Sequence, residues 1–180
     1  MRLLARYNNF ESRHPFLAIC LTSAFGMGAG NLVCQVLMSN LKSKQIDVLL
    51  FLTYTIFGFM VSGPFLKFWW DILEYKIFKN PKEFLRPVKM MLLDQILSPY
   101  ILNGSFLFVL ALYGGKSYSE AYEEVKQKVL SVCLESYKVW PLVMILNFYV
   151  IPANNRVLFT NAISVLWTTY FTYMVSETVS

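Results

Sequence analysis

The stretch KVWPLVMILNFYVIPANNR, residues 138–156, decides how the chain can fold. Its apolar core, residues 139–151, is too short for a bilayer-spanning helix, which needs roughly twenty residues. Pro141 stands near the start of this core and Pro152 directly after its end. Proline is tolerated in the first turn of a helix and interrupts its interior. The stretch therefore predicts a short, broken or re-entrant helix over residues 140–151.

The composition of the whole chain indicates a membrane protein. Of its 180 residues, 56% are apolar and 15% are charged, and its mean hydropathy is +0.47. Soluble domains have about 45–50% apolar and about 25% charged residues. A soluble domain of this length could not bury so much apolar surface. We therefore predict an all-α, multi-pass membrane helical bundle that forms a single integral membrane domain over residues 1–180.

Long apolar runs define the expected membrane spans. Four runs are long enough to cross a bilayer, and they cover residues 16–38, 48–66, 91–113 and 157–175. Two of them contain pairs of small residues four positions apart, Gly26 with Gly30 and Gly58 with Ser62. Because small residues let helix backbones approach closely in lipid, these pairs predict tight packing between helices.

Residues 119–137 have a different pattern from the spans. Alanine and valine recur there at helical spacing, and glutamate and lysine occupy another face. Ser117 and Glu120 have the spacing of a capping box just before this segment. The pattern predicts an amphipathic interfacial helix, which would lie on the membrane surface or cap the bundle.

Polar residues inside the apolar runs are the candidate functional residues. Asp94 is the one carboxylate deep within such a run, and burying it in hydrocarbon would cost about 2.5–3.5 kcal/mol. We therefore expect it to face protein or water. The candidates for a polar seam or pore lining are Asn31, Gln35, Asp94, Gln95, Asn103, Asn147 and Arg156.

Arg156 lies just past the break at Pro152 and has two interpretations. Its five donors could bind carbonyls that the break frees, or pair with Asp94. Alternatively, it is an ordinary interfacial arginine at the start of a helix that reaches lipid phosphate.

Several function classes find no support in the sequence. The net charge is +5, but lysine and arginine stand between apolar runs, as membrane anchors do, so we expect no nucleic-acid partner. Cys20, Cys34 and Cys133 lack CxxC spacing, and His14 is the single histidine. We therefore expect no metal site and no cofactor. The chain also lacks paired carboxylates within one span and a GxSxG motif, so we predict no catalytic residues and no enzyme activity.

Several short patterns occur in an order that resembles the Mpv17 family. They are His14-Pro15, MGAGN with Gln35, GFMVSGP, KMMLLDQILSP, and YKVWPLVMILNFYVIPANNR followed by Trp167 and Tyr170. The most specific part is the C-terminal third. The positions that match the family motifs there, and that the resemblance marks as structural, are Trp140, Pro141, Phe148, Pro152 and Trp167. Two positions depart from the family pattern: Met144 stands where glutamine is common, and Asn31 where aspartate is frequent.

The resemblance implies a four-helix membrane protein of an organelle. The expected location is the mitochondrial inner membrane, and the alternative is the peroxisomal membrane, because the family includes members of both. Family members are thought to form weakly selective channels for small solutes or to support mitochondrial metabolite balance. The alternative function is a structural or scaffolding membrane protein without transport activity. The expected partners are membrane lipids, small solutes and a second copy of the chain.

Overall fold

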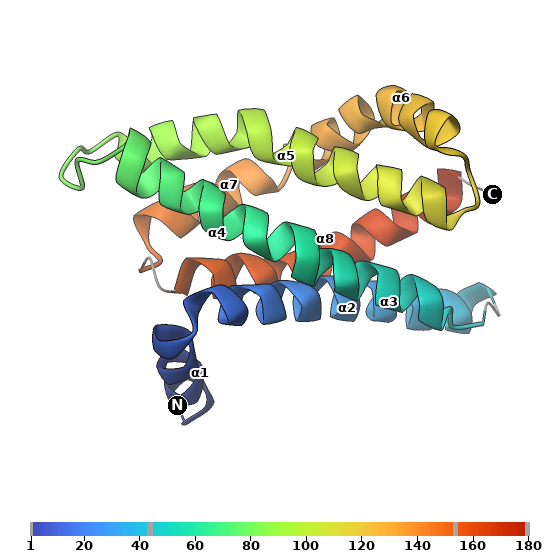
Figure 1. The fold of residues 1–180 in the computed structure, drawn as a ribbon, viewed down its shortest axis with the longest axis horizontal. Coiled ribbons are helices and arrows are strands. Elements are labelled where there is room, and N and C mark those ends of the chain that lie inside the picture. Colours follow the sequence, from blue (N-terminus) through green and yellow to red (C-terminus); the bar gives the residue numbers. More distant parts are fainter. Residues whose placement is uncertain (1, 43–44, 153–154, 179–180) are drawn as a thin grey trace. The chain divides into compact units, whose positions relative to one another are not determined.

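The structure is a computed structural model that describes residues 2–42, 45–152 and 155–178. Within these ranges every regular element is helical, which confirms the predicted all-α class. The elements are α1 (Arg2–Arg13), α2 (Pro15–Lys42), α3 (Val48–Phe57), η1 (Gly58–Ser62), α4 (Gly63–Asp71), η2 (Ile72–Ile77), α5 (Arg86–Tyr113), α6 (Tyr118–Ser136), α7 (Trp140–Tyr149) and α8 (Arg156–Thr178) (Figure 1). The chain divides into two compact units, residues 1–70 with 154–180 and residues 71–153. The single domain expected from the sequence stays a prediction.

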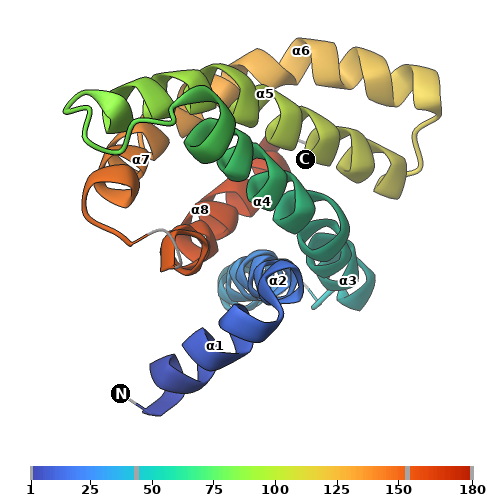
Figure 2. The same ribbon diagram turned by 60° about the vertical axis from the view of Figure 1, so that its left-hand side comes forward.

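The first unit contains both the N-terminal and the C-terminal segment of the chain. Helix α2 packs along α8, and its other side contacts α3 and η1 (Figures 1 and 2). Asp47 begins α3 as its N-cap, because its side chain accepts a hydrogen bond from the Leu50 backbone N–H. The first and last long helices of the sequence are therefore direct neighbours.

Helix α2 has a polar buried face and an apolar exposed face. Ser23 and Asn31 are 1% and 0% exposed, whereas Phe25 is 73% exposed. In water this distribution would be unfavourable. In lipid it is expected, since apolar side chains face the hydrocarbon while small and polar ones face neighbouring helices. The distribution agrees with a membrane bundle.

The run from α3 to η2 contains a proline without breaking. Gly63 and Pro64 follow the turn η1 within this run. The backbone N–H of Gly63 bonds to the Gly58 carbonyl, a step of five residues, so the turn η1 is π-helical. The wider turn gives room for Pro64, which has no N–H and would clash with the carbonyl four residues before it in a regular helix.

The second unit is built on a helical hairpin. Helices α5 and α6 lie side by side and are joined by Gly114 and Gly115 (Figures 1 and 2). Gly115 has φ +82°, a conformation that glycine adopts without strain. On α5, a Cβ at Gly104 would lie 3.5 Å from Val129 and 3.8 Å from Val125. The valine stripe of α6 therefore packs against α5.

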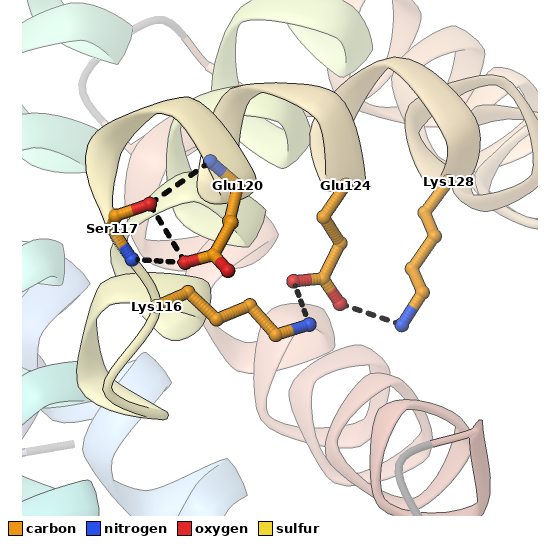
Figure 3. A network of polar contacts seen from close by, with 5 residues as sticks. All are labelled: Lys116, Ser117, Glu120, Glu124 and Lys128. Atoms are coloured by element: carbon orange, nitrogen blue, oxygen red, sulfur yellow. Dashed lines mark hydrogen bonds and ion pairs between the residues drawn. The ribbon is translucent and has the colours of Figure 1, made fainter.

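The start of α6 is the predicted capping box, and an ion-pair cluster follows it (Figure 3). The Glu120 carboxylate accepts a hydrogen bond from the Ser117 backbone N–H at 2.8 Å. One turn later, Glu124 accepts hydrogen bonds from Lys116 at 2.8 Å and from Lys128 at 2.7 Å. These two lysines hold the pKa of the Glu124 carboxyl below its ordinary value.

Three helical runs in the described part of the chain are long and apolar enough to cross a membrane: Pro15–Ser39, Val48–Ile77 and Arg86–Tyr113. Helices α6 and α7 pass the same test together and are bent by 54° at the break between them, as in a broken span or re-entrant loop. Helix α8 is not in this set. The crossing of residues 157–175 stays a prediction.

The stretch of residues 138–156 contains the predicted short helix. Helix α7 begins at Trp140, has Pro141 in its first turn and ends at Tyr149. Ten residues span about 15 Å at 1.5 Å per residue, about half of the hydrocarbon thickness. Helix α7 is therefore too short to cross the bilayer by itself.

Gly58 tests the close packing of α2 against η1. A Cβ at this position would lie 2.6 Å from the Ser23 carbonyl oxygen and 2.8 Å from the Ala24 Cα, and neither backbone atom can move aside easily. We expect Gly58→Ala to cost roughly 1–3 kcal/mol and to lower the melting temperature in detergent by several degrees. Gly104→Ala is the control, because its new Cβ makes only ordinary contacts; equal melting temperatures for the two variants would contradict the prediction.

The Glu124 cluster predicts a pH-dependent contribution to stability. The pKa of Glu124 is lowered in the folded state. The stabilisation that its carboxylate provides is therefore fully present at pH values above its ordinary pKa, and it is lost as the pH falls through the pKa of the folded state. We expect Glu124→Gln to melt about 1–3 °C below wild type at pH 7. This difference should disappear under acidic conditions, below the folded pKa. Melting curves of both proteins across pH check this, and a difference that persists in acid would refute it.

Candidate functional site

Hydrogen bonds between α2 and α8 form one polar group in the first unit. The Asn161 amide nitrogen donates to Thr22 Oγ1 at 3.0 Å and to Ser23 Oγ at 3.2 Å. Farther along α8, the Thr169 hydroxyl donates to the Gly30 carbonyl at 3.0 Å. These side chains have partners on the facing helix, so they serve to hold the two helices together.

Glycines bring α2 and α8 into backbone contact. A Cβ on Gly26 would lie 2.8 Å from Ser164 Oγ and 3.1 Å from the Asn161 carbonyl oxygen. A Cβ on Gly30 would lie 2.6 Å from the Val165 carbonyl oxygen. The close packing predicted from these two glycines is confirmed. No solute could pass along a contact this tight.

Two of the predicted pore residues lie together in the C-terminal half of α2. Asn31 Oδ1 accepts a hydrogen bond from Gln35 Nε2 at 2.7 Å, and the same nitrogen donates to the Asp47 carbonyl at 3.0 Å. Close by, the Tyr54 hydroxyl accepts a bond from Thr172 at 3.0 Å. The amide nitrogen of Asn31 is buried without a hydrogen-bond partner.

Asp94 is the centre of a polar cluster in the second unit. It is 1% exposed, which agrees with its predicted position away from lipid. Its carboxylate accepts hydrogen bonds from Ser98 Oγ at 2.7 Å and from Gln95 Nε2 at 2.9 Å. Both donors belong to α5, so this helix itself provides part of the solvation that a buried carboxylate requires.

Tyr137 compensates for a proline inside α5. Pro99 has no N–H, so the carbonyl of Gln95, four residues earlier, loses its usual helical partner. The Tyr137 hydroxyl donates to this carbonyl at 3.0 Å. Sequence reasoning missed Tyr137. The sequence shows through Pro99 which carbonyl loses its helical partner, but it does not show which residue donates to that carbonyl instead.

Asn147 has the most unusual environment of the predicted residues. It is 0% exposed and lies on the buried face of α7 beside Met144 and Phe148. Neither atom of its amide group has a hydrogen-bond partner, and the side-chain oxygen of Gln95 on α5 also lacks one. Helix α7 packs against α5. Both helices thus carry buried amide atoms that form no hydrogen bond within the protein.

Asn103 is the remaining predicted pore residue of the second unit. It is half-buried on α5, and its amide lies beside the Cys133 thiol of α6. It therefore contributes to the contact between α5 and α6. The structure places the predicted seam in two groups: Asn31, Gln35 and Arg156 in the first unit, and Asp94, Gln95, Asn103 and Asn147 in the second.

Arg156 is the first residue of α8 and is 8% exposed. A side chain that anchors to lipid phosphate would be exposed in this structure, so the burial disfavours that interpretation. The pairing with Asp94 stays a prediction, because the two residues belong to different units.

The motif residues lie at the ends of helices or on helix faces. Trp140 and Pro141 begin α7, Phe148 is buried on it, and Pro152 is exposed beyond its end. Trp167 lies on α8, with its ring 5.7 Å from that of Tyr170. These positions agree with the structural role that the resemblance gave them, which stays a prediction.

Arg86 is a second residue that sequence reasoning missed. Its Nε donates to the Phe78 carbonyl at 2.7 Å, and its Nη2 donates to the Glu74 carbonyl at 3.2 Å. It also pairs with the Glu74 carboxylate at 3.3 Å. Arg86 thus binds carbonyls that the C-terminal end of η2 leaves free. An arginine next to Pro87 at the start of an apolar run was the available signal.

Comparisons with known proteins agree with the motifs. A model described as the Mpv17 / PMP22 family matches residues 111–172. PXMP2/4 family protein 2 of Dictyostelium discoideum is 25% identical over 96% of this chain and 91% of its own length. Mitochondrial inner membrane protein Mpv17 of Mus musculus is 27% identical over 96% of this chain and 97% of its own length. Protein SYM1 of Gibberella zeae is 25% identical over 95% of this chain and 96% of its own length. No solved structure matches the chain.

Tyr137→Phe tests the compensation of Pro99. The change leaves the Gln95 carbonyl without its partner in a partly buried place, which we expect to cost about 1–3 kcal/mol. Tyr149→Phe is the matched control. It removes the same kind of bond, from Tyr149 to the Phe84 carbonyl, at an exposed position where water can replace it. Thermal unfolding in detergent should show a clearly larger loss for Tyr137→Phe, and an equal loss would refute the assignment.

Proposed function

Since the chain is related to the Mpv17 / PMP22 family, we propose that it is a weakly selective channel for small polar solutes in the mitochondrial inner membrane. The membrane bundle and the relatives named for that membrane support the location. The observation that carries the channel activity is Asn147, a fully buried amide with both polar atoms unbonded. We propose no catalytic role, and none of the relatives named above carries an enzyme's name.

The buried amides Asn161 and Asn147 differ in their hydrogen bonds, and Asn31 on α2 has an unbonded nitrogen as well. Asn161 bonds to two side chains of the facing helix, as a residue that only joins helices should. Asn147 makes no such bond, and Gln95 has an unbonded oxygen. An unbonded buried amide costs about 1–3 kcal/mol, which water or a polar solute could recover by bonding to it. Gly26 and Gly30 leave no space between α2 and α8. The unbonded atoms of Asn147 and Gln95 therefore support passage of solutes past α5 and α7.

The chemistry of these groups favours weak selectivity. Among the proposed lining residues of the second unit, Asp94 alone carries an ionisable group, and Ser98 and Gln95 already donate to it. Neutral amides can donate and accept hydrogen bonds with many solutes. Such a lining distinguishes polar from apolar solutes better than it distinguishes one polar solute from another.

The alternative is a scaffolding protein without transport activity. The observation that favours it is the set of hydrogen bonds between α2, α3 and α8, in which polar groups join helices. In this alternative Asn147 would serve no solute. The two functions therefore make opposite predictions for its replacement.

We expect Asn147→Leu to block solute passage while leaving stability unchanged or raised, because it removes no hydrogen bond. The matched control is Asn161→Leu, which removes two bonds between helices and should lower the melting temperature without closing the channel. The measurement is release of small polar solutes from vesicles that contain the purified full-length protein, beside thermal unfolding in detergent.

The outcomes of this experiment distinguish the channel from the scaffold. Passage lost in Asn147→Leu with retained stability supports the lining role. Unchanged passage in that variant overturns the role. Wild-type vesicles that release no more solute than empty ones overturn the channel and favour the scaffold. Fractionation of organelles separately tests the mitochondrial location against the peroxisomal alternative.

A further inference from the structure

We expect the connection between η2 and α5 to lie at a membrane surface. It joins the helical runs Val48–Ile77 and Arg86–Tyr113, each of which is long and apolar enough to cross a bilayer. Residues 75–89, called here the basic loop, include this connection and the helix ends beside it. All of them belong to the second unit. The membrane that holds the two runs must therefore also be near the basic loop.

The basic loop has a fixed shape. Arg86 holds the carbonyls of Phe78 and Glu74 on one side. On the other side, the Tyr149 hydroxyl donates to the Phe84 carbonyl at 2.9 Å. Between them, the backbone N–H of Lys82 bonds to the Asn80 side chain at 3.1 Å. The loop backbone is thus ordered before binding, which lowers the entropy cost of binding.

Three lysines of the basic loop carry uncompensated charge. Its carboxylate, Glu83, pairs with Lys89, and Arg86 is paired with Glu74 just before the loop. Lys76, Lys79 and Lys82 are exposed and form no ion pair within the described part of the chain. By contrast, α6 and the turn after it contain lysines that are ion-paired: Lys126, Lys128 and Lys138.

Large apolar side chains stand exposed between these lysines. Phe84 is 81% exposed and Tyr75 is 64% exposed, and Leu85 and Ile77 are exposed as well. Water would disfavour this surface. At the boundary between headgroups and hydrocarbon, an aromatic ring enters the apolar region while lysine remains with the phosphates.

We propose that the basic loop binds the headgroups of anionic phospholipids. The ammonium groups of Lys76, Lys79 and Lys82 contact lipid phosphate, and Phe84 inserts beside the acyl chains. Anionic lipid fits better than a free anion, because the charged side chains are accompanied by apolar ones. This inference does not depend on the proposed channel activity.

The test measures binding of phosphatidylglycerol and phosphatidylcholine to the purified full-length protein in a nonionic detergent by native mass spectrometry. We expect wild type to prefer the anionic lipid, and the preference to weaken with salt. Each lysine near a charged surface contributes roughly a fivefold effect, so the triple variant Lys76→Gln, Lys79→Gln and Lys82→Gln should reduce this preference by roughly a hundredfold. Phe84→Ser should weaken binding of both lipids alike.

The control is the triple variant Lys126→Gln, Lys128→Gln and Lys138→Gln, which changes net charge equally but removes ion-paired lysines. It should keep the preference. Retention of the preference in the loop variant, or an equal loss in the control, would overturn the proposal. Displacement of phosphatidylglycerol by inorganic phosphate, but not by chloride at equal ionic strength, would also overturn it and indicate a free-anion site.

Discussion

Helices in hydrocarbon gain little by burying apolar side chains against each other, because lipid tails are equally apolar. Close backbone contact and hydrogen bonds must hold them instead. The first unit shows both in one interface, where Gly26 and Gly30 bring α2 against α8 and Asn161 bonds across to Thr22 and Ser23. The two effects depend on each other, since amide and hydroxyl groups reach across only when glycine allows the backbones to approach.

The same solvent makes each free carbonyl costly, and the chain compensates differently for Pro64 and Pro99, which lie inside long helical runs. At Pro64 the preceding turn widens to a π-helix, in which Gly63 bonds five residues back. At Pro99 the helix keeps its regular form, and the Tyr137 hydroxyl binds the Gln95 carbonyl from outside. The first solution needs no other element. The second ties α5 to the C-cap residue of α6, so the proline in one helix is compensated by a residue at the end of another.

Sequence reasoning predicted the features that depend on local pattern. Hydropathy and proline positions gave the helices over residues 16–38 and 140–151, and the capping-box spacing gave the start of α6. The burial of Asp94 followed from the cost of its charge. The π-helical turn before Pro64 was not predicted, because its five-residue hydrogen bond leaves no mark in the hydropathy pattern. No local pattern relates Asn161 to Thr22, Tyr137 to Gln95 or Arg86 to Phe78, since each pair meets only through the fold.

Asn161 and Asn147 are both buried amides, but only the hydrogen bonds of Asn161 stabilise the fold. Asn161 lowers the free energy of the folded state through bonds to α2. Asn147 is buried among Val143, Met144 and Phe148, and its amide is unbonded, so leucine there would serve packing better. Stability alone therefore gives no reason for an amide at this position. An amide is useful at this position if water or a polar solute forms hydrogen bonds with it. The helix that carries Asn147 is α7, which is too short to cross the bilayer.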